Sequence, residues 1–388
     1  LSFSLFATIF FPMRRLLLSF LLITVSAVKD YGIPGWKCDP QVMKKSASIP
    51  QSVHSLRYAD IKIVAAIGDS ITAGNGAGAT SENDTLALSV QYRGLTFSAG
   101  GDLDLDQHVT LANILKKFNP DIFGFSIKTG SANVWANAQL NAAIPGARAV
   151  NLTSQAIDLV QRFKDHPDKV DIVNDWKLVH IFIGGNDICA WCAHPEDESA
   201  DLFGQRIGDA IQILKDNLPR TIVVITGMLD ITVLREMDAK SSRCDVMHRT
   251  ECACEQNQKH STDELRGVCK EYMQKEDDLQ ASGRFDTDDH FTIVIQPFFE
   301  DYDHAPLLPD GSADISLFAP DCFHFSQFGH ALVGRNLWNN LLQPVGSKSM
   351  VADLTNLDAP LNCPDTSCPF IRTTKNSVNC TQFMTPSM

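Results

Sequence analysis

After residue 27 the sequence lacks any apolar run of about 18 residues, the length that a membrane-spanning helix needs. It is also short of positive charge, with 33 Lys and Arg against 46 Asp and Glu and a net charge of −13. An acidic chain lacks the basic surface that binds nucleic acid, so no nucleic-acid partner is expected. Internal repeats and low-complexity tracts are absent too, which favours one globular domain with additions.

The 11 cysteines lack the second half of a zinc motif. Cys189 and Cys192 form one close pair and Cys252 and Cys254 another, but no further C-x-x-C or H-x(3–5)-H pair completes a tetrahedral set. Disulfide bonds are the better prediction, as in secreted chains. The odd count leaves at least one cysteine unpaired within the chain, and the spacing does not decide the connectivity.

Residues 13–27 have the pattern of a secretory signal peptide: two arginines, an apolar run and a small-residue cleavage site. The alternative joins Phe3–Phe11 to this run as a membrane anchor, but two arginines inside such a span would be costly. Cleavage near Ala27 is therefore expected, and residues 1–12 would lie upstream of the true start. The polar tail, residues 366–388, lacks the apolar end of a GPI signal, so a secreted product is predicted.

Three N-x-S/T sequons are consistent with secretion. They begin at Asn83, Asn151 and Asn379.

Apolar runs alternate with helical patterns along the middle of the chain. Strands are expected at 62–67, 177–185, 221–227 and 291–299, and helices at 105–118, 152–163, 202–218, 263–280 and 328–342. Asn151 is a plausible N-cap for the second of these helices. This alternation predicts an α/β fold of three layers, with a central, mostly parallel sheet between two layers of helices.

The chain divides into four parts on this interpretation. They are a signal-peptide region at 1–27, a lead-in at 28–60, a catalytic domain at 61–347 and an irregular, Cys-containing tail at 348–388. Residues 228–262 form a connection too long for a simple loop, so a lid or rim is expected there.

The segment "IKIVAAIGDSITAGNGA", residues 61–77, places Ser70 where the first strand ends. Ligands bind at the carboxyl ends of the strands in such sheets, so Ser70 is a candidate nucleophile. Capping of the following helix is the alternative role for this serine. Ile71 and Thr72 follow it, so this is not the G-x-S-x-G elbow of the α/β-hydrolases.

A nucleophilic serine needs a base, a group that orients the base, and donors for the oxyanion. Asp321 and His324 lie three residues apart in "PDCFHFSQFGH", where one turn could present both, although a surface capping pair is the alternative. Asn186 in "GGNDIC" could donate its amide and Gly146 in "NAAIPGARA" its N–H, although both also fit ordinary turns.

Two further residues complete the candidate site. Asp69 and Asp187 are expected to support the loops that carry the neighbouring residues. His330, at the start of the last helix, is interpreted as structural.

Four blocks of the sequence resemble those of the GDSL/SGNH hydrolase superfamily, and more narrowly of animal phospholipase B. The blocks are "AAIGDSITAGNGA", "NAAIPGA", "IFIGGNDIC" and "DCFHFSQFGHALVGRNLWNNLLQPVG", within a resemblance that covers roughly residues 36–347. The resemblance implies Ser70 as nucleophile, His324 as base and Asp321 as its orienting group. It also implies an oxyanion hole formed by the Ser70 and Gly146 N–H groups and the Asn186 side chain, with no metal or other cofactor.

The activity implied is the hydrolysis of acyl esters in phospholipids and lysophospholipids, with transient contact to a membrane or micelle surface. Some members of this family are tandem arrays with a C-terminal membrane anchor. This sequence shows a single unit and no such anchor, which puts membrane anchoring of this kind in doubt. A secreted acetyl- or carbohydrate esterase of the same superfamily and a catalytically inactive lipid-binding protein remain the alternatives. Apolar rim residues would give lipid access, and the Phe-rich stretches 123–125 and 323–328 are candidates for the rim or for ordinary core packing.

Overall fold

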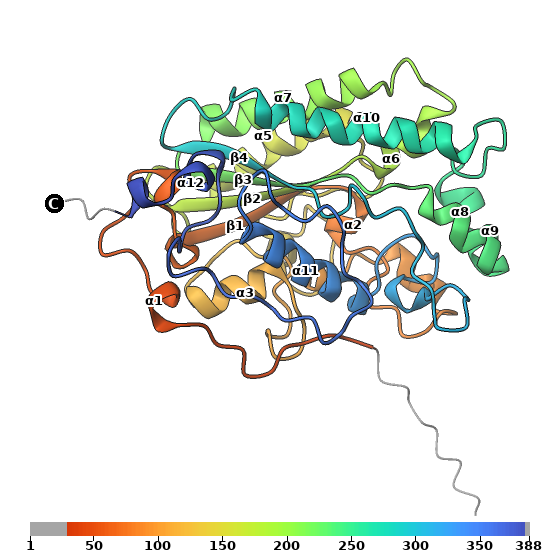
Figure 1. The fold of residues 1–388 in the computed structure, drawn as a ribbon, viewed down its shortest axis with the longest axis horizontal. Coiled ribbons are helices and arrows are strands. Elements are labelled where there is room, and N and C mark those ends of the chain that lie inside the picture. The colour runs from red at the N-terminus through yellow and green to blue at the C-terminus, as the bar shows by residue number, and fades with distance from the viewer. Residues whose placement is uncertain (1–28, 385–388) are drawn as a thin grey trace, which may run out of the picture.

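A parallel sheet of four strands forms the centre of the molecule, in the computed structural model that describes residues 29–384 (Figure 1). The predicted signal peptide at 1–27 lies outside the described residues. The strands are β1 Ile61–Gly68, β2 Trp176–Phe182, β3 Thr221–Thr226 and β4 Phe291–Gln296. They lie side by side in chain order, so their carboxyl ends meet at one edge of the sheet.

Each strand is apolar on both faces because helices cover both sides of the sheet. In β1, Ile63, Ala65 and Ile67 pack into one core, whereas Val64 packs into the core on the opposite face. The outer edge of β1 is also covered, because the Val64 and Ala66 N–H groups donate to backbone carbonyls of the 123–140 segment.

The helices separate into two layers, which confirms the predicted three-layer α/β/α architecture (Figure 1). One face carries α5 Ala149–Asp165, α7 Ala200–Asn217 and α10 Thr262–Ala281. The other face carries α3 Leu111–Phe118 and α11 Gln327–Leu341.

Two helix starts differ from the sequence prediction by three residues or more. The helix expected at 105–118 begins only at Leu111, because the side chain of Thr110 accepts a hydrogen bond from the Asn113 N–H and caps it there. The helix expected at 152–163 begins at Ala149, and Asn151 is not its N-cap. Asn151 lies inside the first turn, where its side chain accepts a hydrogen bond from the Arg148 N–H.

The long connection after β3 is mostly helical. It contains α8 Val233–Lys240 and α9 Ser242–Glu251, which lie beside the carboxyl edge of the sheet with α6 Gly185–Trp191 (Figure 1). Disulfides Cys189–Cys252 and Cys192–Cys254 join the end of this connection to α6. The four cysteines considered for zinc are thus consumed in disulfides.

The lead-in and the tail pack against each other at the other end of the sheet. Cys38 forms a disulfide with Cys363, and the Trp36 indole N–H donates to the Leu361 carbonyl at 2.8 Å. A further disulfide, Cys368–Cys380, closes a small loop in the tail. Of residues 29–384, no helix has the length and apolar composition to cross a bilayer.

Short elements complete the fold. They are α1 Pro40–Met43, α2 Ser70–Ala73, α4 Trp135–Ala138, α12 Thr374–Val378 and 3₁₀ turns at Val53–Ser55, Tyr58–Asp60, Thr85–Ser89, Arg93–Leu95, Ile315–Leu317 and Thr381–Phe383.

Two helical glycines make opposite predictions for stability. A Cβ on Gly334 of α11 would lie 2.6 Å from the Val109 carbonyl oxygen, whereas a Cβ on Gly267 of α10 would meet nothing within 4 Å. Gly334→Ala should therefore lower the free energy of unfolding by about 1–3 kcal/mol through overpacking. Gly267→Ala should raise it by about 0.4–1 kcal/mol because alanine restricts the unfolded chain.

Denaturant unfolding of both variants measures the difference. Equal stability of the two would contradict the close packing of α11 on the start of α3.

Candidate active site

Ser70 is the first residue of α2, at the point where β1 ends. Asp69 caps this helix, because its carboxylate accepts a hydrogen bond from the Ile71 N–H at 2.9 Å. The capping role considered for Ser70 thus falls to Asp69, and the Ser70 hydroxyl is free to bond elsewhere. The preceding Gly68 has no space for a side chain, since a Cβ there would lie 2.4 Å from a carbonyl oxygen of β2.

Ser70, His324 and Asp321 form one hydrogen-bonded row. The Nε2 atom of His324 lies 2.7 Å from the Ser70 Oγ, and its Nδ1 lies 2.6 Å from Asp321 Oδ2. The other oxygen of Asp321 accepts the backbone N–H groups of Phe323 and His324, each at 3.0 Å. All three side chains are buried, so water competes little for these bonds.

The charges of this row shift two pKa values in opposite directions. Burial alone would raise the pKa of Asp321, but the charge and hydrogen bond of His324 and two backbone N–H groups hold it below its usual range. Burial alone would lower the pKa of His324, but Asp321 and the nearby acids Glu251 and Asp69 raise it. The pair therefore favours a proton on the imidazole, which is the state that forms when His324 takes the proton of a serine.

Gly146 and Asn186 line the same cavity as Ser70 and His324, a space of about 180 Å³. Gly146 has φ +75°, and nothing lies within 4 Å of the position of a Cβ, so its backbone is open to the cavity. The Asn186 amide donates one hydrogen bond to the Ala147 carbonyl at 2.9 Å. That bond fixes the orientation of the amide, which has a second N–H to donate.

Asp187 fastens the Gly146 turn to α6. Both of its carboxylate oxygens accept the N–H of Ala149, the first residue of α5, at 2.9 and 3.1 Å. Burial raises the pKa of Asp187 to about 7, against the lowering effect of the Ala149 bond. The carboxylates of Asp69 and Asp187 thus both bond to backbone groups next to the site.

A second, apolar cavity also reaches Ser70. Its volume is about 40 Å³, and the segment after β3 contributes five of its lining residues. The apolar side chains that line it are Ile71, Phe182, Met228, Leu229, Ile231, Val233, Leu234, Phe318 and Phe323.

Of the phenylalanines considered for the rim, only Phe323 lines either cavity. Phe325 and Phe328 are buried in the core with α11. Phe123 and Phe125 pack against the two cores, so the stretch 123–125 follows the core-packing alternative. His330 is also buried, and its Nδ1 accepts the Phe97 N–H at 3.3 Å, as its structural interpretation requires.

Glu251, the last residue of α9, is a site residue that the sequence does not reveal. One of its carboxylate oxygens, one from Asp321 and a ring nitrogen of His324 lie within 4.8 Å of one another. The adjacent disulfide Cys189–Cys252 holds Glu251 near α6. No local motif marks this glutamate, because its approach to His324 depends on how a long connection folds back.

Within residues 29–384, two groups of His, Asp and Glu side chains converge closely enough to hold a metal ion. They are Glu251, Asp321 and His324, and Asp238, His248 and Glu255. Both ring nitrogens of each histidine already bond to protein groups, so neither imidazole offers a free lone pair to a metal.

A serine, an imidazole and a carboxylate in one bonded row at the carboxyl edge of a parallel sheet define the class of serine hydrolases. A profile of the GDSL-like Lipase/Acylhydrolase family matches residues 64–337, and the chain belongs to this family. The resemblance noted in the sequence is thus confirmed at the level of the family.

The chain is also similar to three mammalian proteins called "Phospholipase B1, membrane-associated". It is 41% identical over 337 residues to the human protein, 42% over 339 residues to the mouse protein and 42% over 338 residues to the rat protein. Each match covers 86% of this chain, but only 22–23% of the relative. The chain therefore spans less than a quarter of the length of these relatives.

The charge of Glu251 should affect the pH dependence of kcat/KM. His324 acts as a base only when neutral, so kcat/KM should rise as pH increases through its raised pKa. Glu251→Gln removes one of the charges that raise this pKa, so the acid limb should move to lower pH while kcat falls a few-fold.

A pH–rate profile of each enzyme measures the shift. The control is Glu264→Gln on α10, whose carboxylate pairs with His260 and does not line the cavity. An acid limb that stays in place in Glu251→Gln would show that Glu251 does not act on His324.

Proposed function

We propose that this protein hydrolyses acyl esters of phospholipids and lysophospholipids through an acyl-serine intermediate. The observation that carries the proposal is the Ser70–His324–Asp321 row, with an apolar cavity and a polar cavity that both reach Ser70. In this proposal Ser70 is the nucleophile, His324 the general base and Asp321 the orienting group.

Acylation begins when the His324 Nε2 takes the Ser70 proton. The serine oxygen attacks the ester carbonyl carbon, and the carbonyl π pair moves onto oxygen. His324 then returns its proton to the departing alcohol, so the C–O ester bond breaks and the acyl group stays on Ser70. The Asp321 carboxylate stabilises the imidazolium between these two transfers and keeps its own negative charge.

Deacylation, the second half of the reaction, uses water as the nucleophile. His324 takes a proton from water, hydroxide adds to the acyl carbon, and the tetrahedral species expels the Ser70 oxygen, which regains the proton. The fatty acid leaves and the enzyme returns to its first state.

Three donors would hold the oxyanion in both halves. They are the N–H groups of Ser70 and Gly146 and the side-chain amide of Asn186, each contributing about 3 kcal/mol by analogy with single-donor deletions. The Asn186 bond to the Ala147 carbonyl and the Asp187 bonds to the Ala149 N–H hold these segments before substrate arrives, so little reorganisation is needed.

The apolar cavity supports a lipid substrate over an acetyl ester. Nine apolar side chains surround it, and burial of an acyl chain there would contribute about 0.8 kcal/mol per methylene group. An acetyl group has no methylene to bury. The names of the phospholipase B1 relatives point in the same direction.

Replacement of the nucleophile tests the mechanism. Ser70→Ala should lower kcat by about 10⁴-fold or more, because the remaining groups cannot form the acyl-enzyme. The assay compares release of fatty acid from phosphatidylcholine and its lyso form with release of acetate from an acetylated sugar.

Thermal unfolding of Ser70→Ala serves as the control for folding. Undiminished turnover in this variant would contradict the role of Ser70, and faster release of acetate than of fatty acid would favour the carbohydrate-esterase alternative. A wild-type chain that fails to react with a serine-directed phosphonate would favour the lipid-binding alternative.

We also propose that the catalytic unit, residues 61–347, works outside the cell. Five disulfides support this location, and the three sequon asparagines are all exposed, as glycosylation would require. Cleavage of the signal peptide and glycosylation remain predictions.

A membrane or micelle surface is the proposed site of action. Leu86 is 83% exposed and lies two residues from Leu88, which lines the polar cavity. Ile144 is 47% exposed and precedes Pro145, which lines the same cavity. These apolar side chains beside the cavity would insert among lipid head groups and acyl chains.

Replacement of an exposed leucine tests this surface. Leu86→Asp should lower activity on phosphatidylcholine vesicles by about tenfold, the worth of one buried leucine side chain, and leave hydrolysis of a soluble short-chain ester unchanged. The control is Val378→Asp, which changes an equally exposed residue in α12 at the far end of the sheet (Figure 1).

Vesicle binding by sedimentation and turnover measure the effect. An equal loss in both variants, or none in either, would contradict a docking role for Leu86.

A further inference from the structure

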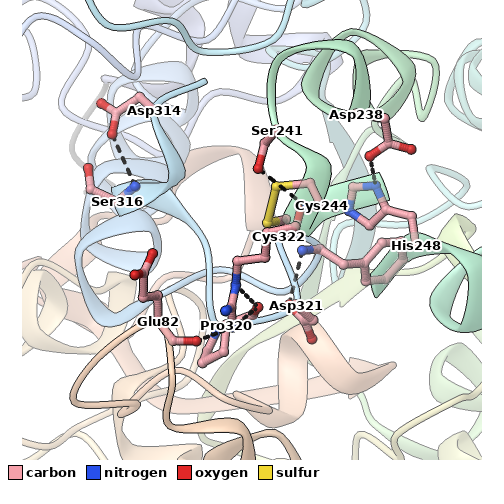
Figure 2. Close-up of a disulfide and its surroundings, with 12 residues drawn as sticks. Glu82, Asp238, Ser241, Cys244, His248, Asp314, Ser316, Pro320, Asp321 and Cys322 are labelled. Carbon is pink, nitrogen blue, oxygen red and sulfur yellow. Dashed lines mark hydrogen bonds and ion pairs between the residues drawn. A yellow bond between two sulfur atoms is a disulfide. The ribbon is translucent and has the colours of Figure 1, made fainter. Parts of the chain in front are cut away.

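Helix α9 is fastened to the turn that carries His324 and Asp321, named here the catalytic turn, residues 319–324. Cys244 forms a disulfide with Cys322, and the Arg243 guanidinium donates two hydrogen bonds to the Pro320 carbonyl, at 3.0 and 3.2 Å. The third contact comes from His248, whose Nε2 lies 3.1 Å from the Cys322 carbonyl oxygen. Figure 2 shows the disulfide with His248 and Asp238 beside it.

The backbone of the catalytic turn depends on such contacts. Cys322 has φ +60°, a conformation that costs energy in any residue except glycine. It lies directly after Asp321 and two residues before His324, so movement of its peptide groups would change the distance between their side chains. Within the turn, the Cys322 N–H to Ala319 and Ala319 N–H to His324 bonds oppose this movement, together with the two N–H bonds to the Asp321 carboxylate, but none of them holds the Cys322 carbonyl.

The bonds of His248 define its protonation state. A carbonyl oxygen only accepts, so the Nε2 facing Cys322 carries a proton. The Nδ1 lies 2.7 Å from Asp238 Oδ1, and the second oxygen of Asp238 accepts a hydrogen bond from the Gln256 amide. An ionised Asp238 therefore needs a proton on Nδ1 as well, and a neutral imidazole has only one N–H to give. With an ionised Asp238, both bonds are made together only by an imidazolium.

We propose that His248 is a positioning residue, whose imidazolium, held by Asp238, fixes the Cys322 carbonyl and thereby the arrangement of Asp321 and His324. The inference rests on the acyl-serine mechanism proposed above. His248 touches no substrate, and it acts only through the catalytic turn.

The charges around His248 support this state. The ring is fully buried, which alone would lower its pKa, but the hydrogen bond and charge of Asp238, the Cys322 carbonyl and the charge of Glu255 together raise it. Asp238 comes from α8, Glu255 from the segment after α9, and Glu251 is a further acid from α9 itself. One oxygen of the buried Glu255 has no hydrogen-bond partner, and burial raises the pKa of that carboxyl to about 7.

The direction of the pH dependence follows from the raised pKa. His248 keeps both protons below it and loses one as pH rises through it, so the bond to Cys322 or the bond to Asp238 is then lost. Activity should therefore rise with pH as His324 becomes neutral and decline again on the high-pH side, here called the alkaline decline, as pH passes through the raised pKa of His248.

Three variants and one control separate this role from simple packing. His248→Gln keeps a side-chain N–H that can reach the Cys322 carbonyl but does not titrate, so it should lose at most a few-fold in kcat and show no alkaline decline. His248→Leu keeps the bulk without a donor and should lower kcat about tenfold or more, the effect of an unpaired buried acceptor, with little change in KM. Asp238→Asn removes the charge that raises the pKa of His248 and should move the alkaline decline to lower pH.

The control is His304→Gln, since His304 is 83% exposed and does not touch the catalytic turn. The measurement is the rate at which a serine-directed phosphonate labels Ser70, followed across the neutral and alkaline range, together with kcat on phosphatidylcholine. Thermal unfolding shows that each variant is folded.

The outcomes distinguish this inference from the proposed function. A wild-type chain that is never labelled at Ser70 would overturn the acyl-serine mechanism and this inference with it. Normal labelling, with an alkaline limb that is identical in the wild type, His248→Gln and Asp238→Asn, would overturn the role of His248 alone.

Discussion

The carboxylate of Asp321 makes two kinds of bond at once, and the geometry of the site depends on both. One oxygen accepts two backbone N–H groups of its own turn, and the other accepts the imidazole N–H of His324. The first set fixes where the backbone of residue 324 lies, and the second fixes how its ring is turned. Since Ser70 is held independently at the end of β1, these bonds decide whether Nε2 meets the serine oxygen.

Parallel strands explain why residues so distant in sequence can meet. The carboxyl ends of β1 and β2 lie next to each other, so Ser70 and Asn186 reach the same cavity without any special loop. The catalytic turn has no strand to place it, because it lies between β4 and α11. A disulfide, an arginine and a histidine of α9 hold it instead, so the long connection after β3 positions a turn that no neighbouring strand positions.

Much of this arrangement could be predicted from sequence, for identifiable reasons. The strands are continuous apolar runs, and Ser70, Asn186 and the Asp321–His324 pair stand in short motifs directly after strands or before a helix. Glu251 and His248 could not be found in this way. Both act through contacts made when α9 folds back on the catalytic turn, and that path depends on disulfides whose pairing the cysteine spacing leaves open.

The helix boundaries show the same limit on a smaller scale. The apolar spacing at 105–110 continues the pattern of α3, but Thr110 caps the helix and the preceding residues form turns instead. At α5 the reverse occurs, because the Asn151 side chain accepts the Arg148 N–H and the helix starts before its apolar stripe. At the starts of α3 and α5, side-chain bonds to the backbone thus decided the helix boundary against the apolar periodicity.

The disulfide between Cys38 and Cys363 joins two segments that are 325 residues apart in the chain. The loop that this bond closes contains all four strands and the three residues of the catalytic row. Closing so long a loop lowers the conformational entropy of the unfolded chain, so the bond stabilises the folded catalytic unit without touching any residue of its site.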